Sequence, residues 1–65
     1  MPVNLTEADL ADAELIDADL TFAKLGGSNL EGADLRGVDL SFCDLTQINL
    51  IAVDISKAKL VGVKM

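Results

Sequence analysis

Leucine-like residues recur at every fifth position of the chain, and we predict that they form its structural core. They are Leu5, Leu10, Leu15, Leu20, Leu25, Leu30, Leu35, Leu40, Leu45, Leu50, Ile55 and Leu60, with Met65 as the last member of the series. Units of five residues account for all 65 residues of the chain. A period this strict is typical of a repeat architecture, and it says more about the fold than about the function.

A spacing of five excludes both a regular helix and a continuous strand. In an α-helix, residues five apart lie about 140° apart around the axis, so the leucines would spiral instead of forming a stripe. In a strand the side chains alternate, so an odd spacing would place successive leucines on opposite faces. We therefore expect each unit to be a very short strand followed by a bend, so that each unit forms one side of a coil.

The other positions of the unit support this interpretation. Two residues before each leucine-like position lies a small or apolar residue, and the residue between them is polar in every unit. Residues two apart in a strand share a face, so we expect the first two classes to point inward and the polar residue to face water. The remaining two positions form the corner. All five glycines occur there, at Gly26, Gly27, Gly32, Gly37 and Gly62, and glycine tolerates the positive φ of a tight bend.

The units Ala8-Asp9-Leu10, Ala18-Asp19-Leu20 and Ala33-Asp34-Leu35 resemble the A(D/N)LXX pattern of the pentapeptide-repeat family. The resemblance covers residues 1–65 and implies a single all-β domain. Its implied fold is a right-handed, four-sided parallel β-helix, a solenoid of about three coils with about 20 residues in each. Phe22 and Phe42 occupy equivalent positions in such coils and should stack on each other.

Departures from the pattern concern the interior and the ends of the predicted solenoid. The small inner position becomes bulkier in the second half, at Val38, Cys43, Ile48, Val53 and Val63, so we expect the corner geometry or the coil width to change there. No terminal cap is recognisable, although solenoids normally need polar end repeats. We expect that the chain is either a piece of a longer solenoid or one whose ends bind partners.

Charge is the most specific functional indication. The net charge is −6, and residues 1–20 carry all of it, with six carboxylates and no Lys or Arg, whereas five acidic and five basic residues balance in 21–65. The acidic candidates for interaction are Glu7, Asp9, Asp12, Glu14, Asp17 and Asp19. An acidic surface disfavours direct nucleic-acid binding, and it suits a basic groove on another protein.

The open ends and the charge gradient together predict head-to-tail self-association. If a second copy continues the repeat after Met65, Lys57 meets Asp12, Lys59 meets Glu14 and Lys64 meets Asp19. Asn49 then meets Asn4, and only Asp54 against Asp9 is unfavourable. We predict open filaments or concentration-dependent oligomers, because the contact does not close.

Catalysis, cofactors and metals find little support in the sequence. The chain has no His, and no Ser or Cys has an evident activating partner, so we expect neither an enzyme nor a cofactor. Glu14, Asp34 and Asp54 would form one column of carboxylates, which we interpret as a solvated ladder rather than a metal site. Cys43 falls on an inward position and is expected to be a buried, reduced thiol. With no signal peptide and no apolar span, we expect a cytoplasmic protein that does not bind membranes.

Three functions remain. The first is a non-catalytic structural or protein-interaction module, with Phe22 and Phe42 either shielding strand edges or forming a contact patch. The second comes from the resemblance: some pentapeptide-repeat proteins imitate DNA, bind a type II topoisomerase such as gyrase, and protect it from inhibitors. The acidic stretch here is short, and the C-terminal helical dimerisation segment of those proteins is absent. The third is a metal-binding rod.

Overall fold

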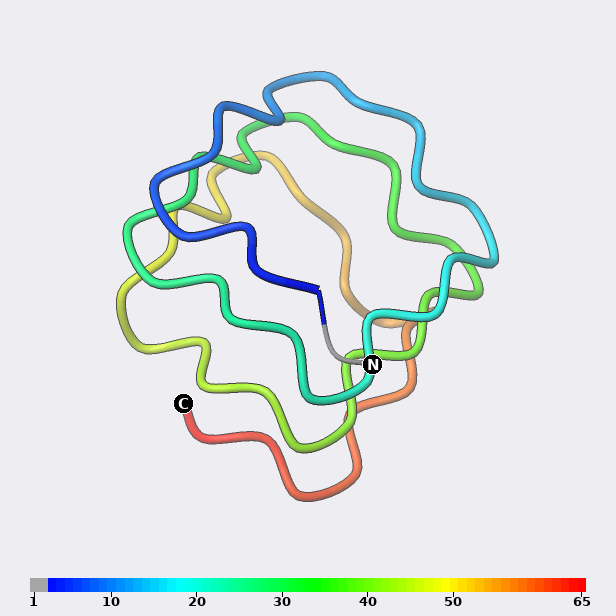
Figure 1. The fold of residues 1–65 in the computed structure, drawn as a ribbon. Helices are drawn as coiled ribbons and strands as arrows, with labels where there is room; N and C mark the ends of the chain where they lie inside the picture. The colour runs from blue at the N-terminus through cyan, green and yellow to red at the C-terminus, as the bar shows by residue number, and fades with distance from the viewer. Residues whose placement is uncertain (1–2) are drawn as a thin grey trace.

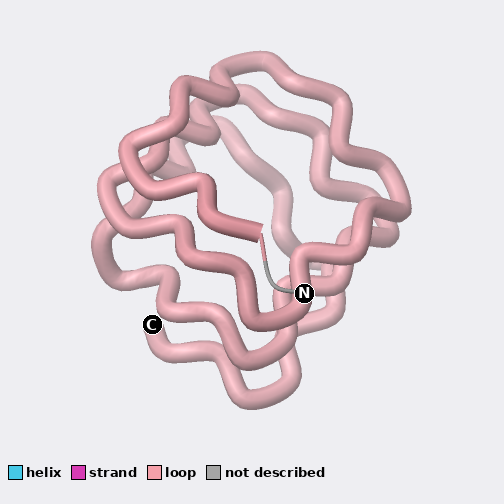
Figure 2. Tube along the Cα trace, viewed as in Figure 1, coloured by secondary structure: helices cyan, strands magenta, loops and turns pink. Residues whose placement is uncertain are grey.

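The structure, a computed structural model, describes residues 3–65, which contain neither a helix nor a continuous strand, so that the trace is coloured as loop throughout (Figure 2). The polar positions instead form isolated parallel bridges between residues 20 apart in sequence. The bridges join Asn4 with Lys24, Asp9 with Asn29, Glu14 with Asp34, Asp19 with Asp39, Asn29 with Asn49, Asp39 with Lys59 and Asp44 with Lys64. The expected short strands are thus reduced to one bridging residue in each described unit except that of Asp54, which has none.

The chain winds upon itself so that segments 20 residues apart lie side by side (Figure 1). We name residues 3–22 coil 1, residues 23–42 coil 2 and residues 43–62 coil 3, and residues 63–65 begin the next coil. A turn separates each unit from the next. The coils lie one under another, and the described stack measures 23 × 23 × 21 Å.

Each corner is a tight turn whose third residue usually has a positive φ. At every corner among residues 3–65 except that of Thr46 and Gln47, the turn is closed by the N–H of the next inner residue, as where Ala8 donates to the Leu5 carbonyl at 3.0 Å. Positive φ at the third residue defines a type II turn, which glycine adopts without steric cost. The predicted role of glycine is confirmed at Gly27, Gly32, Gly37 and Gly62. Gly26 is the exception: it is the second residue of its turn and has no positive φ.

Six residues other than glycine adopt the same conformation at a cost of about 1–2 kcal/mol each. These residues are Glu7, Asp12, Asp17, Phe22, Phe42 and Ala52, with φ between 60° and 66°. Coil 1 carries four of them and coil 2 only one, whereas three of the four such positions in coil 2 are glycine.

The polar position does more than face water. Where it is Asp or Asn, its side-chain oxygen accepts the backbone N–H of the residue two further on, which is the first corner residue. A threonine at that corner adds its hydroxyl, as where Thr46 Oγ1 donates to Asp44 Oδ1 at 2.6 Å. Such Asx turns satisfy a backbone donor that neither the turn nor the ladder uses. The prediction that these residues are only solvated was therefore incomplete.

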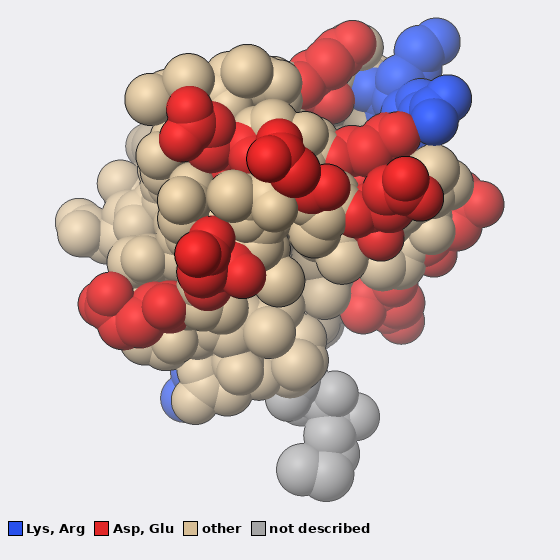
Figure 3. All heavy atoms as spheres, turned by 90° about the horizontal axis from the view of Figure 1, so that it is seen from above, with Lys and Arg blue, Asp and Glu red and all other residues tan. Residues whose placement is uncertain are grey.

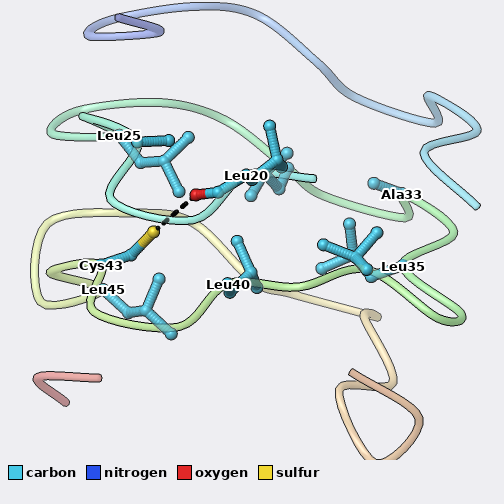
Figure 4. Close-up of a cluster of buried hydrophobic side chains, with 10 residues drawn as sticks. Leu20, Leu25, Ala33, Leu35, Leu40, Cys43 and Leu45 are labelled. Carbon is cyan, nitrogen blue, oxygen red and sulfur yellow. Dashed lines mark hydrogen bonds between the residues drawn. The ribbon is translucent and has the colours of Figure 1, made fainter. Parts of the chain in front are cut away.

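The fully buried core lies in the middle of the stack. Buried inward side chains run from Leu20 to Leu45, and Figure 4 shows the leucines of this cluster with Cys43 and Ala33. The predicted core residues of the two ends are only partly buried: Leu5, Leu10, Leu15, Leu50, Ile55 and Leu60. An inward side chain needs a coil on both sides to lose its contact with water, so the two end layers remain half-exposed.

The ladder is interrupted between coils 2 and 3. Among residues 3–65, no backbone hydrogen bond joins residues 23–25 to residues 43–45. None joins residues 33–35 to residues 53–55 either. The corners that follow Asp44 and Asp54 lack positive φ at Gln47 and Lys57. There the acceptor moves by one residue, and Gly27 N–H donates to the Gln47 carbonyl at 2.8 Å.

Without positive φ at Gln47 and Lys57 these two corners are not type II turns, so their central peptides point in a different direction, which accounts for the shift of the acceptor. Both interruptions lie where the inner position carries Cys43 and Val53 instead of alanine. The expectation that the corner geometry changes in the second half is confirmed at these two corners.

Candidate interaction surfaces

Three carboxylates occupy three of the four corners of coil 1. Glu7, Asp12 and Asp17 each have the positive φ of the third turn residue. In coil 2 the equivalent residues are Gly27, Gly32 and Gly37, and each carboxylate lies where a Cβ on that glycine would be. A glycine in the lower coil thus makes room for the acidic side chain above it.

Three further carboxylates lie on the sides of coil 1. Asp9 Oδ1 accepts the Ala11 N–H at 3.2 Å, and Asp19 Oδ1 accepts the Thr21 N–H at 3.0 Å and its hydroxyl at 2.6 Å. The hydroxyl bond is the largest cause that lowers the pKa of Asp19 below its usual value. Glu14 makes no such bond among residues 3–65. These hydrogen bonds therefore hold the side-chain oxygens of Asp9 and Asp19 against the backbone. The carboxylate of Glu14 and those of the three corner residues extend away from it.

These six carboxylates form what we call the acidic belt: Glu7, Asp9, Asp12, Glu14, Asp17 and Asp19. All six are exposed. In the view from above, Asp and Glu side chains are spread across the face of the molecule, and Lys and Arg are confined to its edge (Figure 3). The structure brings the predicted acidic residues together around one coil.

The three lysines proposed as their counterparts lie away from the belt. Lys57, Lys59 and Lys64 are exposed, and Lys59 and Lys64 pair through the backbone with Asp39 and Asp44. Coil 2 separates them from coil 1, so the structure does not join the two groups within one chain. The only ion pair within residues 3–65 joins Arg36 to Asp34, at 2.8 Å.

The fourth corner of the stack is apolar. The rings of Phe22 and Phe42 stack with centroids 4.8 Å apart and planes 13° apart, while the side chains remain 56% and 51% exposed. Phe42 also covers Gly62, whose added Cβ would lie 2.7 Å from the ring. Val61 is exposed on the same corner. We call Phe22, Phe42 and Val61 the Phe corner. Pro2, which precedes Phe22 by 20 residues and should continue this column, lies outside the described residues.

The predicted column of carboxylates, Glu14, Asp34 and Asp54, does not form a single cation site. Asp34 is engaged by Arg36, whose side-chain hydrogen bonds are the largest cause that lowers the pKa of Asp34. The ladder between Asp34 and Asp54 is open. Within residues 3–65 no group of three or more His, Cys, Asp or Glu side chains could hold a metal ion.

The single thiol is buried. Cys43 Sγ donates to the Leu20 carbonyl at 3.0 Å, as the dashed line in Figure 4 shows. Burial is the main cause that raises the pKa of this thiol. A buried thiol with a raised pKa is a poor nucleophile.

Two features of the coils were not predicted from the sequence. One is the Asx turn, whose signal is Asp or Asn two residues before a corner threonine, as in Asn4 and Thr6 or Asp19 and Thr21. The other is the glycine placed 20 residues after a bulky corner side chain, as in Asp12 and Gly32. Both signals are present in the sequence, but each depends on knowing the corner geometry and the length of the coil.

No helix in the described part of the chain is long and apolar enough to span a bilayer.

Comparison with protein-family models gives a match to pentapeptide repeats, with 8 copies over residues 3–32, 13–50 and 28–65. Among solved structures, the chain is similar to the pentapeptide repeat protein Rfr23 from the cyanobacterium Cyanothece 51142, with 39% identity and a TM-score of 0.72. The match covers 94% of this chain and 38% of that one.

Two structures of trypsin-treated QnrB1, a plasmid-mediated fluoroquinolone resistance protein, are also similar, each with 30% identity. Their TM-scores are 0.53 for the M102R form and 0.55 for the R167E form. Each match covers 94% of this chain and 34% of the other. The chain thus spans little more than a third of the length of these proteins. Comparison with curated proteins gives no significant match.

Proposed function

Because the chain belongs to the pentapeptide-repeat family, a family of β-helix solenoid repeat proteins, we propose that it is a non-catalytic, cytoplasmic protein-interaction module. We further propose the right-handed, four-sided β-helix of that family for residues 1–65 as one domain. The observation that carries the functional proposal is the acidic belt, with six exposed carboxylates around one coil and no cation among them. Such a surface favours a partner with a basic groove and speeds their encounter.

A belt-neutralised variant tests this proposal. Glu7→Gln, Asp12→Asn and Asp17→Asn keep the shape of the corners, and asparagine tolerates positive φ. The control, Glu31→Gln with Asp54→Asn, removes two carboxylates outside the belt, and it is compared with the double variant Asp12→Asn with Asp17→Asn, which removes two within it. We expect a partner captured by the wild type and the control to lose affinity for the neutralised variant and to dissociate as salt is raised. Equal binding of that partner by all these proteins would contradict the role of the belt.

The Phe corner is a second candidate contact. Both rings are more than half exposed and lie outside the buried core. Phe22→Ser with Phe42→Ser should therefore lower the melting temperature only modestly while weakening partner capture or self-association. A double variant that binds as the wild type does would assign the rings to edge shielding, and loss of the folded state would assign them to the core.

A role as a DNA mimic that binds a type II topoisomerase is the alternative, favoured by the likeness to QnrB1. The acidic belt supports it because repeated carboxylates can take the place of phosphates in a basic groove. A gyrase supercoiling assay with a quinolone tests it. Protection that disappears in the belt-neutralised variant would support DNA mimicry. No protection at micromolar protein would exclude this role for the 65-residue chain.

Head-to-tail self-association is the finer form of the partner proposal. The two end layers are half-exposed. A second copy that continues the repeat would cover them and would pair Lys57, Lys59 and Lys64 with the carboxylates of coil 1. In this register Val61, 56% exposed, would also face Ile16, 44% exposed. The starting residue Met1 of the second copy lies outside the described residues.

Sedimentation over a range of concentration and salt measures this association. We expect larger species at high concentration and low salt, and fewer when Lys57, Lys59 and Lys64 are changed to Glu. Exposed ion pairs contribute only about 0–1 kcal/mol each, so they select the register while the apolar layers drive association. A strict monomer under all conditions would overturn the proposal.

A further inference from the structure

The wall of the solenoid has one place where its regular hydrogen bonding fails twice. At most corners an Asp or Asn oxygen accepts the N–H of the first corner residue. At Gly26 the residue that should supply this oxygen is Lys24, which has no acceptor to offer. Within residues 3–65 the Gly26 N–H therefore has no hydrogen-bond partner.

The ladder is open at the same place. In a closed ladder the N–H of the leucine-like residue donates to the carbonyl of the coil below, as Leu5 does to Lys24 at 2.7 Å. The Leu25 N–H has no such acceptor, because the bridge between Lys24 and Asp44 is absent. Two successive backbone donors, on Leu25 and Gly26, are thus left unused beside each other.

A groove of about 310 Å³ lies at this position, and Lys24, Gly26, Phe42, Asp44 and Gln47 contribute to its lining. Glycine opens the space: a Cβ on Gly26 would meet nothing within 4 Å. The equivalent corner residues above and below are Thr6 and Thr46, whose hydroxyls bond Asn4 and Asp44. One end of the groove thus lies where the Thr6 and Thr46 corners carry a hydroxyl side chain.

Charge and shape indicate what the groove accepts. The missing group is a carboxylate or amide oxygen, and Lys24 adds a cation on the rim. The Asp44 carboxylate also lines the groove, and its negative charge offsets that of Lys24. It is held by the Thr46 N–H at 2.9 Å and the Thr46 hydroxyl at 2.6 Å, so it does not bond the Gly26 N–H, and the two unused backbone donors are what favours an incoming carboxylate. On the opposite rim, Phe42 has one face against Phe22 and the other against Gly62, and it offers its ring edge.

The same Asx oxygen is missing at two other corners, after Glu14 and after Lys59. There the first corner residues are Ile16 and Val61, whose side chains occupy the space that Gly26 leaves open. Glu14 would also repel an anion. The corner after Lys24 is therefore the one where a missing Asx oxygen, a lysine and the open groove beside Gly26 occur together.

We propose that this groove binds the free C-terminal carboxylate of a peptide whose last residue is apolar. One carboxylate oxygen takes the place of the missing Asx oxygen on the Gly26 N–H, Lys24 balances its charge, and the apolar side chain packs against the edge of Phe42. The volume lies at the lower limit of small-ligand pockets, about 300–1,000 Å³, which suits one terminal residue and not an extended strand. Capture of a carboxylate by unused backbone donors is a known mode of peptide recognition. The site is independent of the acidic belt.

The amide resonances of Gly26 and Leu25 report on this site directly. Titration with the peptide acetyl-Ala-Ala-Ala-Leu should move both resonances downfield, with a dissociation constant of about 1 mM, as expected for so small a contact. The same peptide with a C-terminal amide should leave them unmoved. If the amide form shifts them equally, or if neither peptide does, the proposal is overturned. If only acetyl-leucine shifts them, the site takes small carboxylates and the peptide assignment is wrong.

Variants of Lys24 separate the contribution of its charge from that of the missing Asx oxygen. Lys24→Asn supplies the Asx oxygen from the chain itself and should abolish the peptide-induced shift while keeping the fold. Lys24→Gln removes the charge without filling the vacancy and should weaken binding only about twofold to fivefold. The matched control, Lys59→Asn, supplies the missing side-chain oxygen to the Val61 N–H and should leave peptide binding unchanged. Unaltered binding by Lys24→Asn, or loss of binding by Lys59→Asn, would refute the assignment.

Discussion

At the scale of single residues, the corners determine which substitutions the chain tolerates. At most corners the second corner residue has a positive φ, and below Glu7, Asp12 and Asp17 it must also leave room for the side chain stacked above it. Gly32 meets both conditions, with φ of 73° and the Asp12 carboxylate over its Cα. Gly26 is subject to neither, because its φ is not positive and the space beside it is open.

This difference predicts opposite outcomes for two glycine-to-alanine changes. Gly32→Ala should lower the free energy of unfolding by about 1–3 kcal/mol, from the strained φ and the displaced Asp12. Gly26→Ala should be neutral or stabilising by up to about 1 kcal/mol, because alanine restricts the unfolded chain. Urea denaturation of both variants measures this. Equal destabilisation by the two would contradict the assigned corner geometry.

The Asx turns make a residue-scale prediction about acidity. The hydroxyl of Thr46 is the largest cause that lowers the pKa of Asp44, and its backbone N–H is the next. Thr46→Val should therefore raise the pKa of Asp44 toward the ordinary value of about 3.9. Carbon-detected titration of the carboxylates measures it, with Asp19, which keeps its Thr21, as the internal control.

The sign of the resulting pH dependence follows from the lowered pKa. A carboxyl whose folded pKa is depressed contributes stability that is present above its unfolded pKa and is lost as the pH falls through its folded pKa. The bonds made by Asp19 and Asp44 should therefore be lost below about pH 4. A pKa of Asp44 unchanged by Thr46→Val would show that the hydroxyl bond does not form in solution.

At the scale of the repeating element, the inward leucine positions do not tolerate a charged residue where coils lie on both sides. Leu35 is 1% exposed in coil 2. Leu35→Asp should abolish the folded state, because a buried, unpaired carboxylate costs several kcal/mol against a total stability of about 5–15 kcal/mol. The same outcome is expected for Leu30→Asp. Circular dichroism measures it, and a cooperative melt of Leu35→Asp would show that the residue does not point inward.

Asp39→Asn is the control for this series. Asp39 is half-buried rather than fully exposed, and its Oδ1 accepts the Ser41 N–H at 2.9 Å. An asparagine oxygen can accept the same bond, so the variant should melt close to the wild type. We therefore expect this position to tolerate exchange between Asp and Asn.

At the scale of the whole molecule, protection should follow the stacking of the coils. The Leu30 N–H donates to Asn49 at 2.9 Å and the side chain is fully buried, so this amide should be among the slowest to exchange with solvent. The Leu25 side chain is 1% exposed, but its N–H lies in the open ladder and should exchange much faster. Hydrogen exchange followed by NMR measures both amides in one experiment. Equal protection of the two would show that the ladder closes in solution.

Several properties were already present in the sequence. The period of five predicted the coil, because neither a helix nor a strand keeps residues five apart on one face. The spacing of Phe22 and Phe42 predicted their stacking, and the count of carboxylates in residues 1–20 predicted an acidic end. The first depends only on the period, the second on the 20-residue coil that the family resemblance implies, and the third on the composition of one stretch of the chain, so none of them requires the coordinates.

Tertiary structure decided what depends on the contact between one coil and the next. The open ladder beside Lys24 goes with a neighbouring corner that lacks positive φ at Gln47, and no single unit shows it. The pairing of Asp12 with Gly32 and the unused Gly26 N–H emerge only when units 20 residues apart are stacked. Local sequence determines the shape of a unit, because turns and side-chain direction are local. Which donors remain free and which side chains are half-buried are settled between the coils, because hydrogen bonds and burial there are shared by two of them.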